Sequence, residues 1–100
     1  GEATCEFMNQ FQMDFGIIGI SGISNDGSLL DFDLREVRVA QAIINNSTNV
    51  LLAADQSKFG RNAMIKQGNI AQIHHLFTDQ HPPKEIEEIL STHNIATHIV

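Results

Sequence analysis

The sequence of 100 residues contains no tryptophan, no tyrosine and a single cysteine, Cys5. One cysteine cannot form an internal disulfide, and a lone thiol is typical of a reducing compartment, so we expect the cytoplasm. Without tyrosine or tryptophan, a surface that stacks nucleic-acid bases would have to use six phenylalanines, most of which fall in core-like positions. These absences disfavour a secreted, disulfide-stapled domain and a binder of single-stranded nucleic acid.

Basic residues are also scarce. Six lysines and arginines stand against twelve acidic residues, which gives a formal net charge of -6. A chain of this charge repels the phosphates of DNA, so we do not expect it to bind DNA by itself. The sequence has no apolar run of the roughly twenty residues that a membrane helix needs, and no basic-then-apolar signal segment. It therefore predicts a soluble protein.

Strand and helix patterns alternate along the chain. Apolar runs predict buried strands over residues 15–20, 50–54, 73–77 and 95–100, and helical spacing predicts helices over residues 2–12, 33–47 and 83–94. Asp33 fits the N-cap of the middle helix, and Glu36 three residues later fits a capping box. The alternation predicts one α/β domain, an open parallel sheet with flanking helices, whose ligands bind beyond the carboxyl ends of the strands.

Two segments follow predicted strands at that edge of the sheet. The turn from Gly19 to Gly22 can let backbone N–H groups approach an anion, although an ordinary tight turn would also use these glycines. After the second strand, Lys58 and Arg61 place two cations where they can meet a phosphate, or else remain solvated loop residues. Lys58 is the better candidate because it lies nearer the end of the strand.

The five histidines do not form a metal-binding pattern. They include no pair spaced to share one helix face and have no cysteine partner. His74 and His75 point to opposite faces of a strand, so they cannot readily bind one ion together. We expect neither a metal site nor a cofactor.

Three strings resemble the effector domain of DeoR-type transcriptional repressors: FGIIGISGISNDGSLLDFDLREVR (residues 15–38), ADQSKFGRNAM (54–64) and LFTD (76–79). The resemblance covers essentially the whole chain. It implies the fold of ribose-5-phosphate isomerase and CoA-transferase, and binding of a phosphorylated metabolite. It also implies that residues 1–100 are the C-terminal part of the effector-binding domain. The family's N-terminal winged helix-turn-helix, which binds operator DNA, and its upstream glycine-and-threonine phosphate loop would then lie outside this chain.

Position by position, the resemblance implies an effector or phosphate site formed by Gly19, Ser21, Gly22, Glu36, Asp55 and Lys58. Lys58 would bind the phosphate and Asp55 would orient it, whereas Glu36 can equally serve the helix cap. The strings GEAT and SKFGRNAM are most similar to members that respond to sn-glycerol 3-phosphate, so this ester is the expected effector. We further expect a homo-oligomer that reaches operator DNA only through the missing domain.

Two rival functions remain open. Sugar-phosphate isomerases and glucosamine-6-phosphate deaminase share this fold, and the deaminase has an Asp-Gly-His turn whose histidine acts in acid-base chemistry. Here the corresponding residues are Ser-Gly-Ile at 21–23 or Asp-Gly-Ser at 26–28. Neither turn contains a histidine. The loss of this acid-base group would lower the reaction rate by about a hundredfold or more, so we do not expect the chain to be an enzyme. The second rival function is that of a dimerisation module, which would associate through Phe7, Met8 and Phe11.

Overall fold

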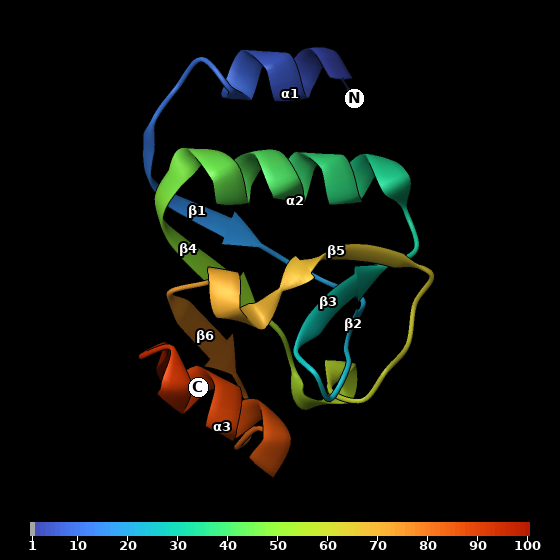
Figure 1. The fold of residues 1–100 in the computed structure, drawn as a ribbon, viewed down its shortest axis with the longest axis vertical. Coiled ribbons are helices and arrows are strands. Elements are labelled where there is room, and N and C mark those ends of the chain that lie inside the picture. The colour runs from blue at the N-terminus through green and yellow to red at the C-terminus, as the bar shows by residue number, and fades with distance from the viewer. Residues whose placement is uncertain (1) are drawn as a thin grey trace.

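The computed structural model describes residues 2–100, which form two sheets and three α-helices (Figure 1). The elements in chain order are α1 (Glu2–Met8), β1 (Met13–Ile18), β2 (Gly22–Ile23), β3 (Ser28–Asp31), α2 (Leu34–Asn46), β4 (Ser47–Ala53), the 3-10 helix η1 (Gln56–Lys58), β5 (Ile65–Asn69), the 3-10 helix η2 (Ile70–Gln72), β6 (His75–Thr78), α3 (Lys84–Thr92) and β7 (Ala96–Ile99). The larger sheet is parallel with the order β1-β4-β6-β7, and the smaller is antiparallel with the order β2-β3-β5.

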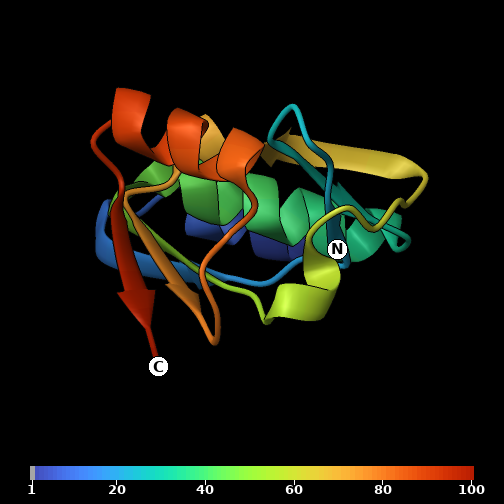
Figure 2. The same ribbon diagram turned by 90° about the horizontal axis from the view of Figure 1, so that it is seen from below.

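The parallel sheet confirms the predicted α/β class. Each predicted strand overlaps one of its four strands, although β1 starts and ends two residues before the predicted run. The small antiparallel sheet was not predicted. It lies with α2 and α3 on one side of the parallel sheet, as Figure 2 shows.

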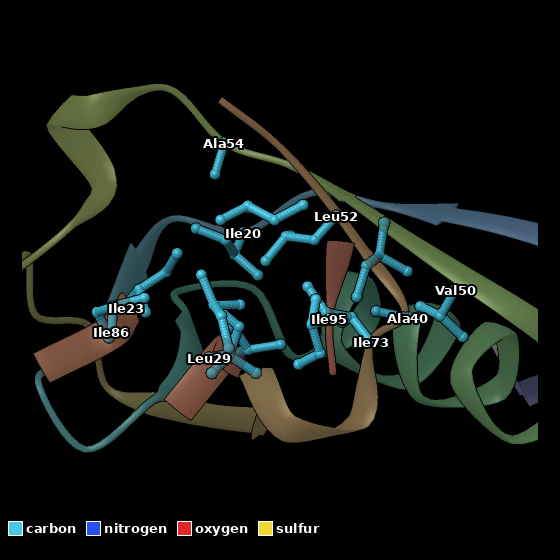
Figure 3. Close-up of a cluster of buried hydrophobic side chains, with 14 residues drawn as sticks. Ile20, Ile23, Leu29, Ala40, Val50, Leu52, Ala54, Ile73, Ile86 and Ile95 are labelled. Carbon is cyan, nitrogen blue, oxygen red and sulfur yellow. The ribbon is translucent and has the colours of Figure 1, made fainter. Parts of the chain in front are cut away.

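The core fills the space between the parallel sheet and these elements. Ile18, Leu52 and Leu76 lie in one row across β1, β4 and β6, and all three are buried. Their partners from the other layer are apolar side chains of α3 and the small sheet, among them Leu29 and Ile86 (Figure 3). Burial of these large aliphatic side chains contributes about 1.5–3 kcal/mol each and is the main force that holds the two layers together.

The first helix is shorter than predicted and lies outside the core. It ends at Met8, because the backbone then turns, with Gln10 N donating to Phe7 O and Phe11 N to Met8 O, before it enters β1. The helix has no buried residue and packs on α2, on the side away from the sheet (Figure 1). The expectation of a helix through Gln12 was therefore wrong beyond Met8.

The caps of the other helices follow the sequence with one exception. Asp33 caps α2 by accepting a hydrogen bond from Arg35 N at 2.8 Å, and Asn94 ends the α3 segment with a positive φ of 56°. The prediction of a capping box is wrong, because within the described residues the Glu36 side chain makes no hydrogen bond to the backbone N–H of Asp33. Glu36 lines a cavity instead.

Candidate functional site

A cavity of about 670 Å³ lies at the carboxyl end of β1, the edge of the sheet where the sequence predicted ligand binding. Its walls are the end of β1 with the turn that follows, the end of β3, one side of α2 and a single residue of β5, Gln67. Ile18 and Ala40 make part of the wall apolar, and carboxylates make part of it acidic. The volume falls within the range of small-molecule pockets.

Three of the predicted site residues line this cavity: Gly19, Ser21 and Glu36. The hydroxyl of Ser21 donates to the Asp31 carboxylate at 3.0 Å. The same carboxylate, on a buried residue, accepts the backbone N–H of Phe32 at 2.7 Å. These bonds fix the turn after β1 against the end of β3, so the cavity rim is held in place before any ligand arrives.

Gly19 and Gly22 differ in what they contact. A Cβ on Gly19 would meet nothing within 4 Å, so its backbone is open to the cavity. A Cβ on Gly22 would lie 2.1 Å from the carbonyl oxygen of Arg61. Gly22 is outside the cavity wall, and the close approach of the backbone at Arg61 is what requires a glycine there.

Asp55 and Lys58 contact one another directly after β4. The Asp55 carboxylate caps η1 by accepting from Ser57 N at 2.8 Å and from the Ser57 hydroxyl, and its other oxygen lies 3.8 Å from Lys58 Nζ. The Ser57 hydroxyl is the largest influence that lowers the pKa of Asp55, followed by the Ser57 N–H and, after a smaller opposing effect of burial, by Lys58. Asp55 is therefore ionised at neutral pH and lies beside the Lys58 ammonium group, and its orienting role stays a prediction.

Asp55 and Lys58 do not line the cavity. The segment after η1 nevertheless runs beside the turn that follows β1. Phe59 pairs with Ile23, and Gly60 N donates to Ile23 O at 2.8 Å. The predicted residues thus form two groups, one in the cavity wall and one on the neighbouring loop.

Gln67 and Arg35 are among the cavity residues that sequence reasoning missed. Gln67 is only 2% exposed; its Nε2 donates to Gly19 O at 3.3 Å, and its Oε1 has no hydrogen-bond partner among the described residues. Arg35, on the first turn of α2, lies 3.5 Å from Asp33 and places a cation at the cavity. Gln67 gave no signal because its strand was not predicted, but Arg35 stands two residues after a recognisable helix cap.

Within residues 2–100, no three histidine, cysteine or acidic side chains cluster in a way that could hold a metal ion. His75 and His98 do meet, with Nδ1 and Nε2 3.0 Å apart, on neighbouring strands. No helix in this part of the chain is long and apolar enough to cross a membrane.

Comparison with known proteins gives the site its context. A family model described as the DeoR C terminal sensor domain matches residues 1–80. The chain belongs to this family. The resemblance seen in the sequence is therefore confirmed, and the geometry above belongs to a DeoR sensor domain.

Three relatives of this DeoR sensor domain are bacterial regulators. It is 54% identical to the glycerol-3-phosphate regulon repressor of Escherichia coli, over 95% of this chain and 38% of the relative. It is 52% identical to the repressor of the same name in Haemophilus influenzae, over 82% of this chain and 32% of the relative. It is 33% identical to the HTH-type transcriptional repressor CsqR of Escherichia coli, over 95% of this chain and 36% of the relative.

These relatives carry the names of repressors and not of enzymes, in agreement with the prediction that the chain is not an enzyme. The chain spans less than two fifths of the length of each of the three.

Proposed function

We propose that this DeoR sensor domain binds sn-glycerol 3-phosphate and that binding releases a longer repressor from operator DNA. The observation that carries the proposal is the identity of 54% and 52%, over most of the chain, to two repressors named for glycerol 3-phosphate. Residues 1–100 would be the C-terminal part of the effector-binding domain. A separate domain would bind operator DNA, and the protein would act in the cytoplasm as a homo-oligomer.

The chemistry of the two residue groups suits a small phosphorylated polyol. Carboxylate oxygens in the cavity, those of Glu36 among them, are acceptors for hydroxyl groups. Lys58 on the neighbouring loop supplies an ammonium group that can bind phosphate. Because the chain has a net charge of -6, a phosphate needs such a local cation to bind at all.

In this assignment Gly19 and Ser21 present backbone and hydroxyl groups to the ligand, Glu36 accepts from a ligand hydroxyl, and Asp55 keeps Lys58 in position. Gly22 contributes by letting the loop at Arg61 approach the turn. A ligand that contacts both groups would join the turn after β1 to the loop after β4. The binding free energy would thereby act on the relative position of these two segments.

A thermal-shift and calorimetric titration of the protein at the length of its relatives tests the proposal. sn-Glycerol 3-phosphate should raise Tm, because a ligand at a hundred times its Kd adds about 2.7 kcal/mol to the free energy of unfolding. Glycerol, inorganic phosphate and the enantiomeric ester are the controls and should act only at much higher concentrations. If Tm rises only with another sugar phosphate, that compound and not sn-glycerol 3-phosphate is the effector. If Tm rises with no phosphorylated metabolite, the sensing role is refuted.

Release from DNA needs its own measurement. Operator DNA can be selected from a random pool by the ligand-free protein, and its affinity then measured by fluorescence anisotropy with and without the ester. A coupling free energy of ~1–3 kcal/mol should weaken DNA binding by about five- to 150-fold. Unchanged DNA affinity at saturating ester would contradict the proposed regulation while leaving ligand binding intact.

A further inference from the structure

Asp79 ends the string LFTD at residues 76–79 and belongs to neither of the two residue groups of the candidate site. It directly follows β6 and is exposed on the loop that leads to α3. Its carboxylate oxygen Oδ1 accepts a hydrogen bond from the backbone N–H of Gln56 at 2.8 Å. Because Gln56 is the first residue of η1, this bond joins the loop after β6 to the segment that carries Lys58.

The bond extends the pairing of two parallel strands past their ends. Alternate residues of a strand donate their N–H groups to the same neighbouring strand. Directly after β4, Ala54 N donates to the carbonyl oxygen of Phe77 at 3.0 Å. Two residues further, Gln56 N again donates to the chain at the end of β6, and there the Asp79 carboxylate takes the place of a backbone carbonyl. The side chain of Asp79 therefore adds one bond to the ladder and fixes the start of η1 relative to β6.

The short helix η1 has no apolar anchor of its own. It comprises three residues, none of which is buried. The N–H groups at the start of a helix also lack partners within the helix. Asp79 accepts from Gln56 N, and Asp55 accepts from the next N–H along the chain at the same distance of 2.8 Å. Asp55 is local to the segment, whereas Asp79 ties it to a neighbouring strand.

We propose that Asp79 is a positioning residue for the phosphate site: it fixes η1 against the end of β6 and thereby holds the Lys58 ammonium group where it binds the phosphate. The role of Lys58 rests on the proposed function, whereas the hold on η1 does not. Asp79 is not itself a phosphate contact, because an ionised carboxylate has no donor and repels an anion. Its charge instead strengthens the bond that it accepts from the backbone N–H.

A fixed η1 favours binding because a ligand then does not have to order the loop. Without the bond to Asp79, η1 can take up several positions, and only some of them present the ammonium group of Lys58 to the ligand. The apparent affinity falls in proportion to the fraction of molecules that are competent to bind. Loss of Asp79 should therefore act on affinity through Lys58 alone.

Hydrogen exchange in the protein at the length of its relatives tests the hold on η1 without any ligand. Asp79→Ala removes the acceptor, whereas Asp79→Asn keeps an oxygen at nearly the same place. We expect the peptide that contains residues 54–60 to exchange at least about threefold faster in Asp79→Ala than in wild type, because its amides open more often, and Asp79→Asn to stay close to wild type. Asp14→Ala is the matched control, since Asp14 is an exposed aspartate near the start of β1, at the other end of the sheet. Unchanged exchange in Asp79→Ala overturns the proposal.

Calorimetry with sn-glycerol 3-phosphate on the same proteins tests the consequence for Lys58. Asp79→Ala should weaken binding about three- to tenfold, whereas Asp79→Asn and Asp14→Ala should stay within about twofold of wild type. In a Lys58→Ala background, Asp79→Ala should cause no further loss, because no ammonium group is left to position. A residue that only supports the fold, or one that contacts the ligand itself, would instead cost the same affinity in both backgrounds.

Three results of the calorimetry overturn the positioning role: an equal loss in both backgrounds, a loss in Asp79→Asn as large as in Asp79→Ala, and wild-type affinity in Asp79→Ala. Failure of the proposed function has a different signature. If wild type binds no phosphorylated metabolite, the role of Lys58 falls, and the exchange rates still decide whether Asp79 holds η1.

Discussion

The ammonium group of Lys58 lies 3.8 Å from the carboxylate of Asp55, three residues before it, and Asp55 is in turn fixed by the backbone N–H of Ser57. The 27% exposure of the Lys58 side chain leaves the ammonium group partly accessible, so a phosphate can reach it without displacing a buried ion pair. This arrangement holds one cation on the loop after β4, next to Phe59, which pairs with Ile23.

Lys58→Ala should weaken binding of sn-glycerol 3-phosphate about ten- to hundredfold, because a charge-assisted hydrogen bond to phosphate contributes ~1.5–3 kcal/mol. Calorimetry on the full-length protein measures the loss, and Tm without ligand should hardly change. Lys84→Ala, at the start of α3 and away from the cavity, is the control. Equal affinities for wild type and Lys58→Ala would mean that Arg35, or a residue outside this chain, binds the phosphate.

Gly22→Ala should lower stability, whereas Gly19→Ala should lower effector affinity alone. The first places a Cβ 2.1 Å from the Arg61 carbonyl oxygen, so we expect a loss of ~1–3 kcal/mol in the free energy of unfolding, as for other overpacked sites. The second meets nothing within 4 Å and should leave stability unchanged but reduce effector affinity by narrowing the cavity. Urea denaturation and calorimetry measure the two quantities. A stable Gly22→Ala would show that the loop at Arg61 moves freely.

Asp26 should make stability depend on acid pH. The pKa of Asp26 is lowered to about 2, first by the hydrogen bond from the Ser24 hydroxyl and then by bonds from Ser28. A lowered pKa stabilises the folded state above the ordinary value of 3.8, and this contribution is lost as pH falls through about 2. Asp26→Ala should therefore lower Tm at pH 7 and make no difference below pH 2.

The control for the acid prediction is Glu88→Ala on the exposed side of α3, which should reproduce the wild-type curve of Tm against pH. A deficit of Asp26→Ala that persists unchanged from pH 7 to pH 2 would contradict the role of the carboxylate charge. It would leave the turn geometry as the only cause.

Gln67→Met should raise the free energy of unfolding by about 1 kcal/mol. A buried amide oxygen without a partner costs ~1–3 kcal/mol, and methionine removes it at similar volume while giving up only the 3.3 Å bond to Gly19 O. Gln80→Met, at an exposed position before α3, is the control. Destabilisation of Gln67→Met would mean that the bond to Gly19 outweighs the unpaired oxygen.

The sequence revealed the parallel sheet because its strands are short apolar runs, such as residues 50–54, whose pattern does not depend on distant partners. The small sheet has no such signal. Gly22–Ile23 is only two residues long, and β5 has the mixed sequence Ile-Lys-Gln-Gly-Asn. Its pairing, for example of Ser28 with Asn69, arises only when the chain has folded.

The candidate site divides in the same way. The contact of Asp55 with Lys58 is local and follows from an Asp-X-Ser-Lys sequence after a strand. The cavity is not local, because Gln67 reaches it only through β5. The exposure of Phe15 and Ile17 on β1 was not predicted either, because an apolar strand sequence does not show which of its two faces the rest of the chain covers.

The order of pairing in the parallel sheet also has a consequence during biosynthesis. Met13 at the start of β1 pairs with Ser47 at the start of β4, after β2, β3 and α2 have intervened. Ribosomes add roughly 5–20 residues per second, so β1 waits several seconds for its only partner in this sheet among the described residues. During that interval Phe15 and Ile17 are unprotected on a nascent strand, and holdase chaperones that bind short apolar segments should occupy this site first.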